Sequence, residues 1–143
     1  MDNTTLKPLD GRLFPRFSGL CTFFRLPHHP EPEDLDISVL GVPWDGSVSY
    51  RPGARFGPRA AREASVLMRA YSHESEIRPF DTLAVADAGD VSVVPHDCAQ
   101  TFANIETHIT RAIAHGGKPV CVGGDHSIAL PILRAQYKQH GPL

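Results

Sequence analysis

Three short apolar runs, each followed by a segment of helical periodicity, constrain the fold of this chain more than any other feature. The runs consist mainly of aliphatic and β-branched residues, as in strands buried inside a sheet, and they cover residues 36–42, 83–87 and 119–122. The helical segments cover residues 58–70, 98–115 and 128–139. Strand and helix therefore alternate three times, which predicts an α/β fold with a parallel sheet and helices on its faces.

The predicted helices carry recognisable end signals. Pro58 suits the first position of a helix. Asp97 and Gln100 resemble a capping box before the second helix, and the glycine pair 116–117 is a typical stop after it. The first helix would present one apolar face, made of Ala60, Ala64, Leu67, Met68 and Tyr71.

The composition is that of a globular chain of one domain, with 143 residues, 41% hydrophobic and 21% charged. A formal net charge of −2 gives no reason to expect nucleic acid or an acidic membrane as a partner. No apolar run approaches the roughly 20 residues of a membrane span. Residues 1–30 lack the layout of a signal peptide, so we expect a cytoplasmic protein. The cysteines form no C-x-x-C pair, which argues against a disulfide framework or a zinc site.

The first 34 residues differ from the rest of the chain. They are rich in proline and single aromatic residues without a sustained period, which predicts an irregular N-terminal arm over 1–34 that lies on the domain or on a neighbouring subunit. The α/β domain would then cover 35–143. Within the arm, His28 and His29 could ligate a metal or form a solvated turn, and the following proline favours the turn.

Four arginines, Arg51, Arg55, Arg59 and Arg62, are concentrated in the segment RPGARFGPRAAR. One interpretation is an anion clamp, since arginine binds carboxylate and phosphate through two parallel hydrogen bonds. The other is a loop and helix start held by ion pairs to neighbours such as Glu63 or to another subunit. The second is favoured, because neither G-x-x-x-x-G-K-[ST] nor G-x-G-x-x-G accompanies the arginines.

The loops after the three predicted strands should meet at one edge of the sheet, where parallel sheets bind their ligands. After the third strand, the sequence GGDHS places His126 at this edge, near a helix start that Ser127 could cap. Such an imidazole can act as a metal ligand or a general base, although a lone histidine is usually neither. Asp125 could orient the imidazole or cap the helix. Asp87 and Asp90 offer paired carboxylates at a strand end, or a simple turn.

Three motifs, in this order along the chain, resemble the amino-terminal half of the ureohydrolase family of arginases and agmatinases, within it the agmatinase and guanidinobutyrase branch. They read GVPWDGSVSYRPGARFGPRAAREAS, FDTLAVADAGDV and GGKPVCVGGDHSIALPILRAQYKQHGP. The resemblance implies a three-layer α/β/α fold of the arginase type, incomplete in this chain. It implies hydrolysis of a linear guanidino compound, such as agmatine or guanidinobutyrate, to urea and an amine. It also implies a homo-oligomer, either a trimer or a hexamer.

The same resemblance implies a pair of Mn²⁺ ions, with Ni²⁺ as the alternative. Two metal ions that bridge one water lower its pKa and hold the resulting hydroxide for attack on the guanidinium carbon. The histidine of the family's GGDH motif is its first metal ligand and maps onto His126. The other ligands come from a D-x-H-x-D and a D-x-D segment, which are absent here. No residue of this chain matches a catalytic motif of the family, so we expect the 143-residue chain alone to be inactive.

Two other functions stay open at this point. The chain could be a non-catalytic interaction subunit, or a truncated relative, that pairs with a complete enzyme of this type. It could also bind a small anion through the RPGARFGPR loop. The identity of the guanidino substrate does not follow from these residues.

Overall fold

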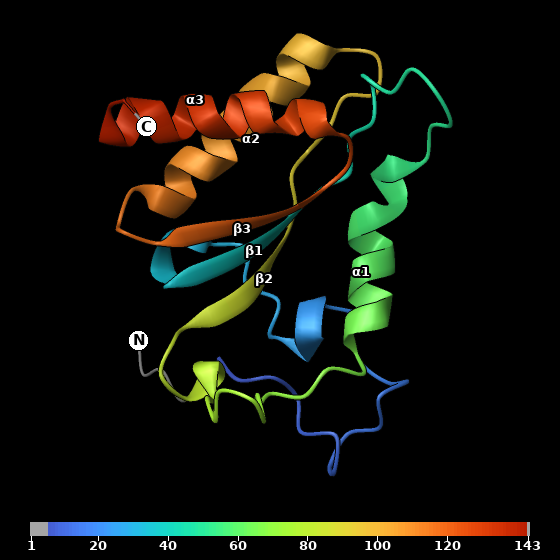
Figure 1. Cartoon of the computed structure of the whole chain (residues 1–143), viewed down its shortest axis with the longest axis vertical. Helices are drawn as coiled ribbons and strands as arrows, with labels where there is room; N and C mark the ends of the chain where they lie inside the picture. Colours follow the sequence, from blue (N-terminus) through green and yellow to red (C-terminus); the bar gives the residue numbers. More distant parts are fainter. Residues whose placement is uncertain (1–5, 143) are drawn as a thin grey trace.

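The computed structural model describes residues 6–142, and its centre is a three-stranded sheet. The strands are β1 (Ile37–Val42), β2 (Val85–Asp90) and β3 (Lys118–Gly123), arranged in the order β2-β1-β3. Both pairs are parallel, so the strand crossovers place all three carboxyl ends at one edge (Figure 1). The predicted parallel sheet is confirmed.

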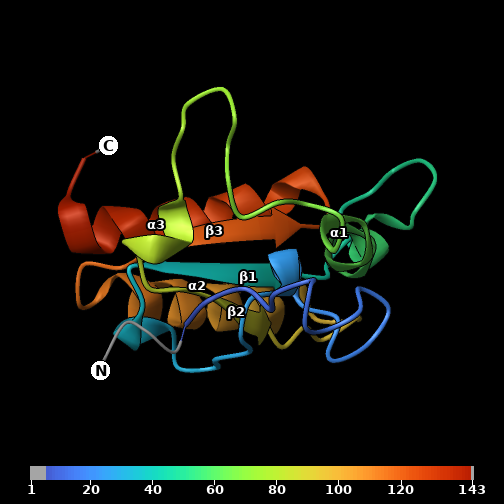
Figure 2. The same cartoon turned by 90° about the horizontal axis from the view of Figure 1, so that it is seen from below.

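Helices cover both faces of this sheet. Two of them, α2 (Cys98–Ile113) and α3 (Ala129–His140), lie side by side on one face. The third, α1 (Gly57–Ser65), lies on the other face together with the N-terminal arm (Figure 2). This gives the three layers that the sequence predicts.

Each face of the sheet has its own apolar core, because side chains alternate along a strand. On the face of α2 and α3, Leu40 and Val42 pack against Ile105 and Ile109, and all four are fully buried. On the face of α1, the neighbouring strand residue Val39 packs with members of the arm and of β2, chiefly Phe23, Leu26 and Val85.

The predicted helix over 58–70 is too long, since α1 ends at Ser65. The chain leaves the helix through tight turns, in which the amides of Leu67 and Met68 donate to the carbonyls of Ala64 and Ser65. Leu67 is 73% exposed and Met68 61%, so no neighbouring surface holds this part of the predicted apolar face. Without buried apolar contacts, a continued helix gains little stability.

Two further details differ from the sequence prediction. β2 extends to Asp90, so Asp87 lies inside the strand instead of ending it. At the start of α2, Asp97 accepts a hydrogen bond from the amide of Gln100 at 2.8 Å, which confirms the cap. The reciprocal half of the capping box is missing, because the Gln100 side chain donates to Asn104.

The described part of the arm is mostly irregular, with two single 3₁₀ turns, η2 (Phe23–Arg25) and η3 (Pro32–Asp34). It runs along the outer side of β2, where the Asp87 amide donates to the Pro27 carbonyl and the His29 amide donates to the Asp87 carbonyl. The division into an arm over 1–34 and a domain over 35–143 stays a prediction. Within residues 6–142, no helix is both long and apolar enough to cross a membrane.

Candidate functional site

The carboxyl edge of the sheet holds the turn that follows β3, and this turn requires glycine. A Cβ atom on Gly124 would lie 2.0 Å from the Trp44 carbonyl oxygen and 2.7 Å from that of Val42. Real Cβ atoms do not come so close to backbone, so only a residue without a side chain lets the turn after β3 press against the loop after β1. The two loops are therefore held at backbone contact distance.

Asp125 links these loops through its carboxylate. One oxygen accepts from the amide of Ser127 at 2.8 Å, which caps the 3₁₀ turn η6 (His126–Ile128). The other accepts from the amide of Ser47, in the loop after β1, also at 2.8 Å. The cap is thus Asp125, and Ser127 is its donor, contrary to the capping role suggested for Ser127. Trp44 completes the contact by donating its indole N–H to the Ser127 hydroxyl at 3.2 Å.

His126 is the first residue of η6, and its side chain is exposed at this edge. The hydrogen bonds of Asp125 go to serine donors, while the interpretation that Asp125 orients His126 stays a prediction. Within residues 6–142, no three histidine, cysteine, aspartate or glutamate side chains are grouped closely enough to hold a metal ion. His126 is therefore placed to bind a ligand, but the described residues do not surround it with further donors.

The carboxylates of β2 are occupied by an arginine of α1. Arg62 donates to Asp87 at 2.7 and 3.0 Å and to Asp90 at 2.7 Å. The amides of Phe23 and Gly89 each donate to Asp87 at 2.9 Å. Burial raises the pKa of Asp87, but the hydrogen bonds from Arg62 and the two amides outweigh it, so that the pKa lies below its usual range. This group is a structural ion pair that joins α1, β2 and the arm.

A second buried carboxylate, Asp45, organises the loop after β1. It forms an ion pair with Arg55 and accepts a hydrogen bond from the amide of Gly53 at 2.7 Å. The side-chain hydrogen bond from Arg55 is the largest influence and lowers the pKa of Asp45 to about 2, against the opposing effect of burial. Sequence reasoning missed Asp45, because nothing in its local sequence reveals that it pairs with an arginine ten residues later.

The arginine-rich segment is held by ion pairs, as the favoured interpretation predicts. Arg55 pairs with Asp45, Arg59 with Glu63, and Arg62 with Asp87 and Asp90. Arg51 instead stacks on the ring of Tyr50, with its guanidinium carbon 5.0 Å from the ring centre. Three of the four predicted clamp residues are thus neutralised within the chain.

The two histidines of the arm join it to β2. The amide of His29 donates to the Asp87 carbonyl at 2.9 Å, and Nδ1 of His28 lies 3.2 Å from the same oxygen. Both residues therefore belong to the backbone bridge that runs along β2.

Comparisons with known proteins agree with this architecture. A sequence profile described as the arginase family matches residues 35–143. The chain belongs to the arginase family. The ureohydrolase resemblance and the three-layer arginase-like fold are therefore confirmed, and in this arginase-family chain β3 and the GGDHS turn lie inside the matched region.

Individual relatives of this arginase-family chain show how much of the fold it contains. Guanidinobutyrase from Pseudomonas aeruginosa is 44% identical over 144 residues, which cover 99% of this chain and 45% of that enzyme. The solved structure of proclavaminate amidino hydrolase from Streptomyces clavuligerus matches with a TM-score of 0.84 at 39% identity, over 91% of this chain and 43% of that one. Trypanosoma cruzi formiminoglutamase, solved with Mn²⁺₂, matches with a TM-score of 0.71 at 26% identity, over 83% and 40% of the two chains. The chain spans less than half the length of these relatives.

Proposed function

We propose that the protein to which these residues belong is a metal-dependent amidinohydrolase that cleaves a linear guanidino compound to urea and an amine. The observation that carries the proposal is the turn after β3, where an exposed histidine stands at the ligand-binding edge of an arginase-family sheet. Guanidinobutyrase, which is 44% identical, supports a guanidino acid such as 4-guanidinobutyrate as the first substrate to test, with agmatine as the second.

A pair of metal ions requires more ligands than the described residues bring together. Within 6–142, His126 supplies one imidazole at the carboxyl edge, and no group of three suitable donors exists. The carboxylates of Asp45, Asp87 and Asp125 are engaged by arginines, amides or a hydroxyl. These residues alone do not fit a two-metal centre, so any further ligands would come from outside the described range.

Within this proposal, His126 would be one ligand of a manganese centre, with nickel as the alternative metal. Neutral imidazole is a suitable ligand for such ions. Asp125 would be a positioning residue, since it fixes the turn that presents the imidazole. The bound metal would supply hydroxide at neutral pH. A homo-oligomer in the cytoplasm is part of the same proposal.

The test is a pair of histidine variants of the natural gene product. His126→Ala should reduce urea release from 4-guanidinobutyrate or agmatine at least about 100-fold, because loss of a metal ligand exceeds the effect of losing an outer partner. His140→Ala is the matched control, since His140 is also exposed but lies at the far end of α3. Elemental analysis of Mn and Ni should show less bound metal in His126→Ala alone. Turnover of His126→Ala equal to that of the control would refute the assignment.

The 143-residue chain by itself is proposed to be inactive. Expressed alone, it should release no urea and hold manganese at well below one equivalent, because a single imidazole binds divalent ions weakly. Steady urea production from pure residues 1–143 would contradict this.

A further inference from the structure

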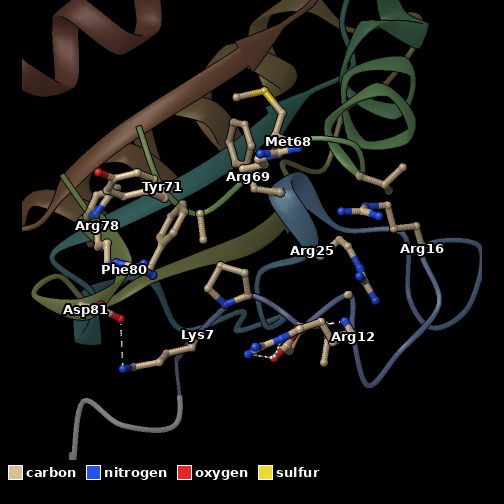
Figure 3. Close-up of a pocket in the computed structure, with 18 of the residues that line it drawn as sticks. Lys7, Arg12, Arg16, Arg25, Met68, Arg69, Tyr71, Arg78, Phe80 and Asp81 are labelled. Carbon is tan, nitrogen blue, oxygen red and sulfur yellow. Dashed lines mark hydrogen bonds and ion pairs between the residues drawn. The ribbon is translucent and has the colours of Figure 1, made fainter. Parts of the chain in front are cut away.

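A large cavity lies on the α1 side of the molecule, away from the carboxyl edge of the sheet. Its volume is about 1120 Å³, and its walls come from the arm, residues 7–25, and from the segment 66–81 after α1. Figure 3 shows the arm residues on one side and Met68, Arg69, Tyr71, Arg78 and Phe80 on the other. Two stretches far apart in sequence thus enclose one space.

The cavity is strongly basic although the whole chain carries a net charge of −2. Two of its cations are neutralised, because Lys7 pairs with Asp81 at 3.2 Å and Arg12 with Asp10 at 2.8 Å. The complete set of charged residues in its walls is Lys7, Asp10, Arg12, Arg16, Arg25, Arg69, Arg78 and Asp81. The cavity therefore has a clear excess of positive charge.

Four of these arginines form no ion pair with a carboxylate within residues 6–142, namely Arg16, Arg25, Arg69 and Arg78. Of these four, Arg78 is held by a ring instead, since its guanidinium stacks on Tyr71 at 4.9 Å from the ring centre. The arginines of segment 51–62 are different, because Arg55, Arg59 and Arg62 each form an ion pair with a carboxylate. Most of the positive charge of the cavity is therefore not neutralised within residues 6–142.

Arg25 is the most informative of the four. It is only 6% exposed, and its Nη2 donates to the carbonyls of Phe14 at 3.0 Å and Pro15 at 3.4 Å. Carbonyl groups hold the side chain in place but do not neutralise it, and the Asp10 carboxylate, whose pKa is lowered mainly by Arg12 and slightly by Arg25, forms its ion pair with Arg12. A buried guanidinium without an ion pair of its own is costly, so this arrangement favours an oxyanion beside it.

Gly11 lies next to both Arg25 and Arg16. A Cβ atom on Gly11 would be 3.5 Å from Nη1 of Arg25 and 3.5 Å from Nη2 of Arg16. Two guanidinium groups therefore approach each other around this glycine, although like charges repel. An oxyanion between them would relieve the repulsion and accept hydrogen bonds from both.

The backbone beneath this pair is strained. Phe24 and Arg25 have φ angles of 56° and 60°, in the left-handed region that residues with a side chain seldom adopt. Consecutive residues of this kind persist only where the surrounding structure enforces them, and they are concentrated at ligand sites. Here the strained turn directs Arg25 into the wall of the cavity.

The remaining walls are apolar. Phe24 and Phe80 are partly buried there, while Met68 and Leu9 keep 61% and 41% of their surface exposed. Apolar surface next to a cluster of guanidinium groups suits a ligand with a charged head and an apolar body.

We propose that this cavity binds a small organic oxyanion, a carboxylate or a phosphate monoester with an apolar body, whose charged head is held by Arg16, Arg25 and Arg69. The site is separate from the His126 edge and does not depend on the proposed hydrolase activity. A carboxylate and a phosphate monoester both present an oxyanion to the arginines, and two probe compounds distinguish between them.

The test is calorimetric titration of the natural gene product with phenyl phosphate and with 4-phenylbutyrate, and with the neutral 4-phenylbutanol as the control ligand. At least one anion should bind saturably with a Kd below about 1 mM, and the neutral compound at least tenfold more weakly. The anion that binds more tightly identifies the head group. Failure of both anions to saturate below about 1 mM, or equal binding of the neutral compound, would overturn the proposal.

Three variants locate the binding. Arg16→Gln and Arg69→Gln replace exposed residues and should each weaken anion binding about tenfold. Arg25→Gln should weaken it further, and the two exposed variants keep the test valid if this buried residue is needed for folding. Arg59→Gln, an exposed arginine paired with Glu63 outside the cavity, should leave binding unchanged. Wild-type affinity in both Arg16→Gln and Arg69→Gln, or equal loss in Arg59→Gln, would overturn the proposal. Urea release, measured on the same samples, separates this result from that for His126.

Discussion

The two outer strands of the sheet differ in how the rest of the chain covers them. The arm covers the outer side of β2, since residues 27–29 bridge to its backbone. Arg62 neutralises Asp87, which is only 1% exposed. β3 pairs with β1 on one side, and within residues 6–142 no strand pairs with its other side. Val120 on β3 is 48% exposed, whereas Val85 on β2 is 5% exposed.

The two strands therefore differ in how much apolar surface lies exposed beside them. Apolar exposure continues from β3 onto α3, where Leu130, Leu133 and Tyr137 are 47%, 53% and 58% exposed. A free strand next to exposed apolar residues is a site of association or aggregation unless something covers it. The β2 side is thus covered by other parts of the chain, whereas the β3 side leaves a strand edge and apolar side chains uncovered within residues 6–142.

The largest effect is expected at the closed side, for Asp87→Ala. Removing one partner of a buried ion pair leaves two amides, and Nε and Nη2 of Arg62, without their acceptor, which should lower the free energy of unfolding by about 3 kcal/mol. That is the lower end of the usual range, because Asp90 remains 2.7 Å from Arg62. Urea unfolding curves give the value, and Asp90→Ala is the control with a smaller expected loss. Equal losses of stability in the two variants would mean that Asp87 contributes no more than Asp90 to this ion pair.

Acid should destabilise the same side of the molecule. The pKa of Asp87 is lowered in the folded state, so its stabilising effect is complete above the unfolded pKa of about 3.9 and is lost as the pH falls through the folded value. Wild-type stability should therefore decline below about pH 5 more steeply than that of Asp87→Asn. Unfolding midpoints in urea at several pH values test this. Parallel curves for the two proteins would contradict it.

The smallest effect is expected at the open side. Val120→Lys should change the free energy of unfolding of the 143-residue chain by less than about 0.5 kcal/mol, since half of this side chain already faces solvent. Val85→Lys is the matched variant on β2, where a buried charge should cost several kcal/mol. The measurement is again denaturant unfolding. A loss above about 1 kcal/mol for Val120→Lys in the natural protein would show that another segment or subunit covers β3.

Periodicity alone predicted three strands, three helices and the parallel sheet, because these features depend on local apolar patterns. It failed where a distant partner decides the outcome. The helix predicted to residue 70 stops at Ser65, since Leu67 and Met68 have no surface to pack against. The strand predicted to end at Asp87 continues, since Arg62 on α1 neutralises that carboxylate inside the sheet.

The functional sites follow the same pattern, since features set by local sequence were predicted and those set by distant partners were not. The glycine break before His126 is visible in the sequence, because a turn at a strand end needs such residues. Asp45 was not found, as its partner Arg55 reaches it only after the loop has folded. The basic cavity was not predicted either. Its walls come from two separate stretches between Lys7 and Asp81, which no local sequence pattern connects.

The closure of β2 by the arm also sets an order of events during synthesis. The amide of Phe23 donates to Asp87, which is 64 residues later in the chain. At about 5–20 residues per second, a ribosome needs about 3–13 s to make that partner after Phe23. The Phe23 segment of the arm is therefore made before its partner and cannot pack against β2 until β2 has formed. Docking of the arm on β2 thus follows the synthesis of α1 and β2, although the arm precedes both in the chain.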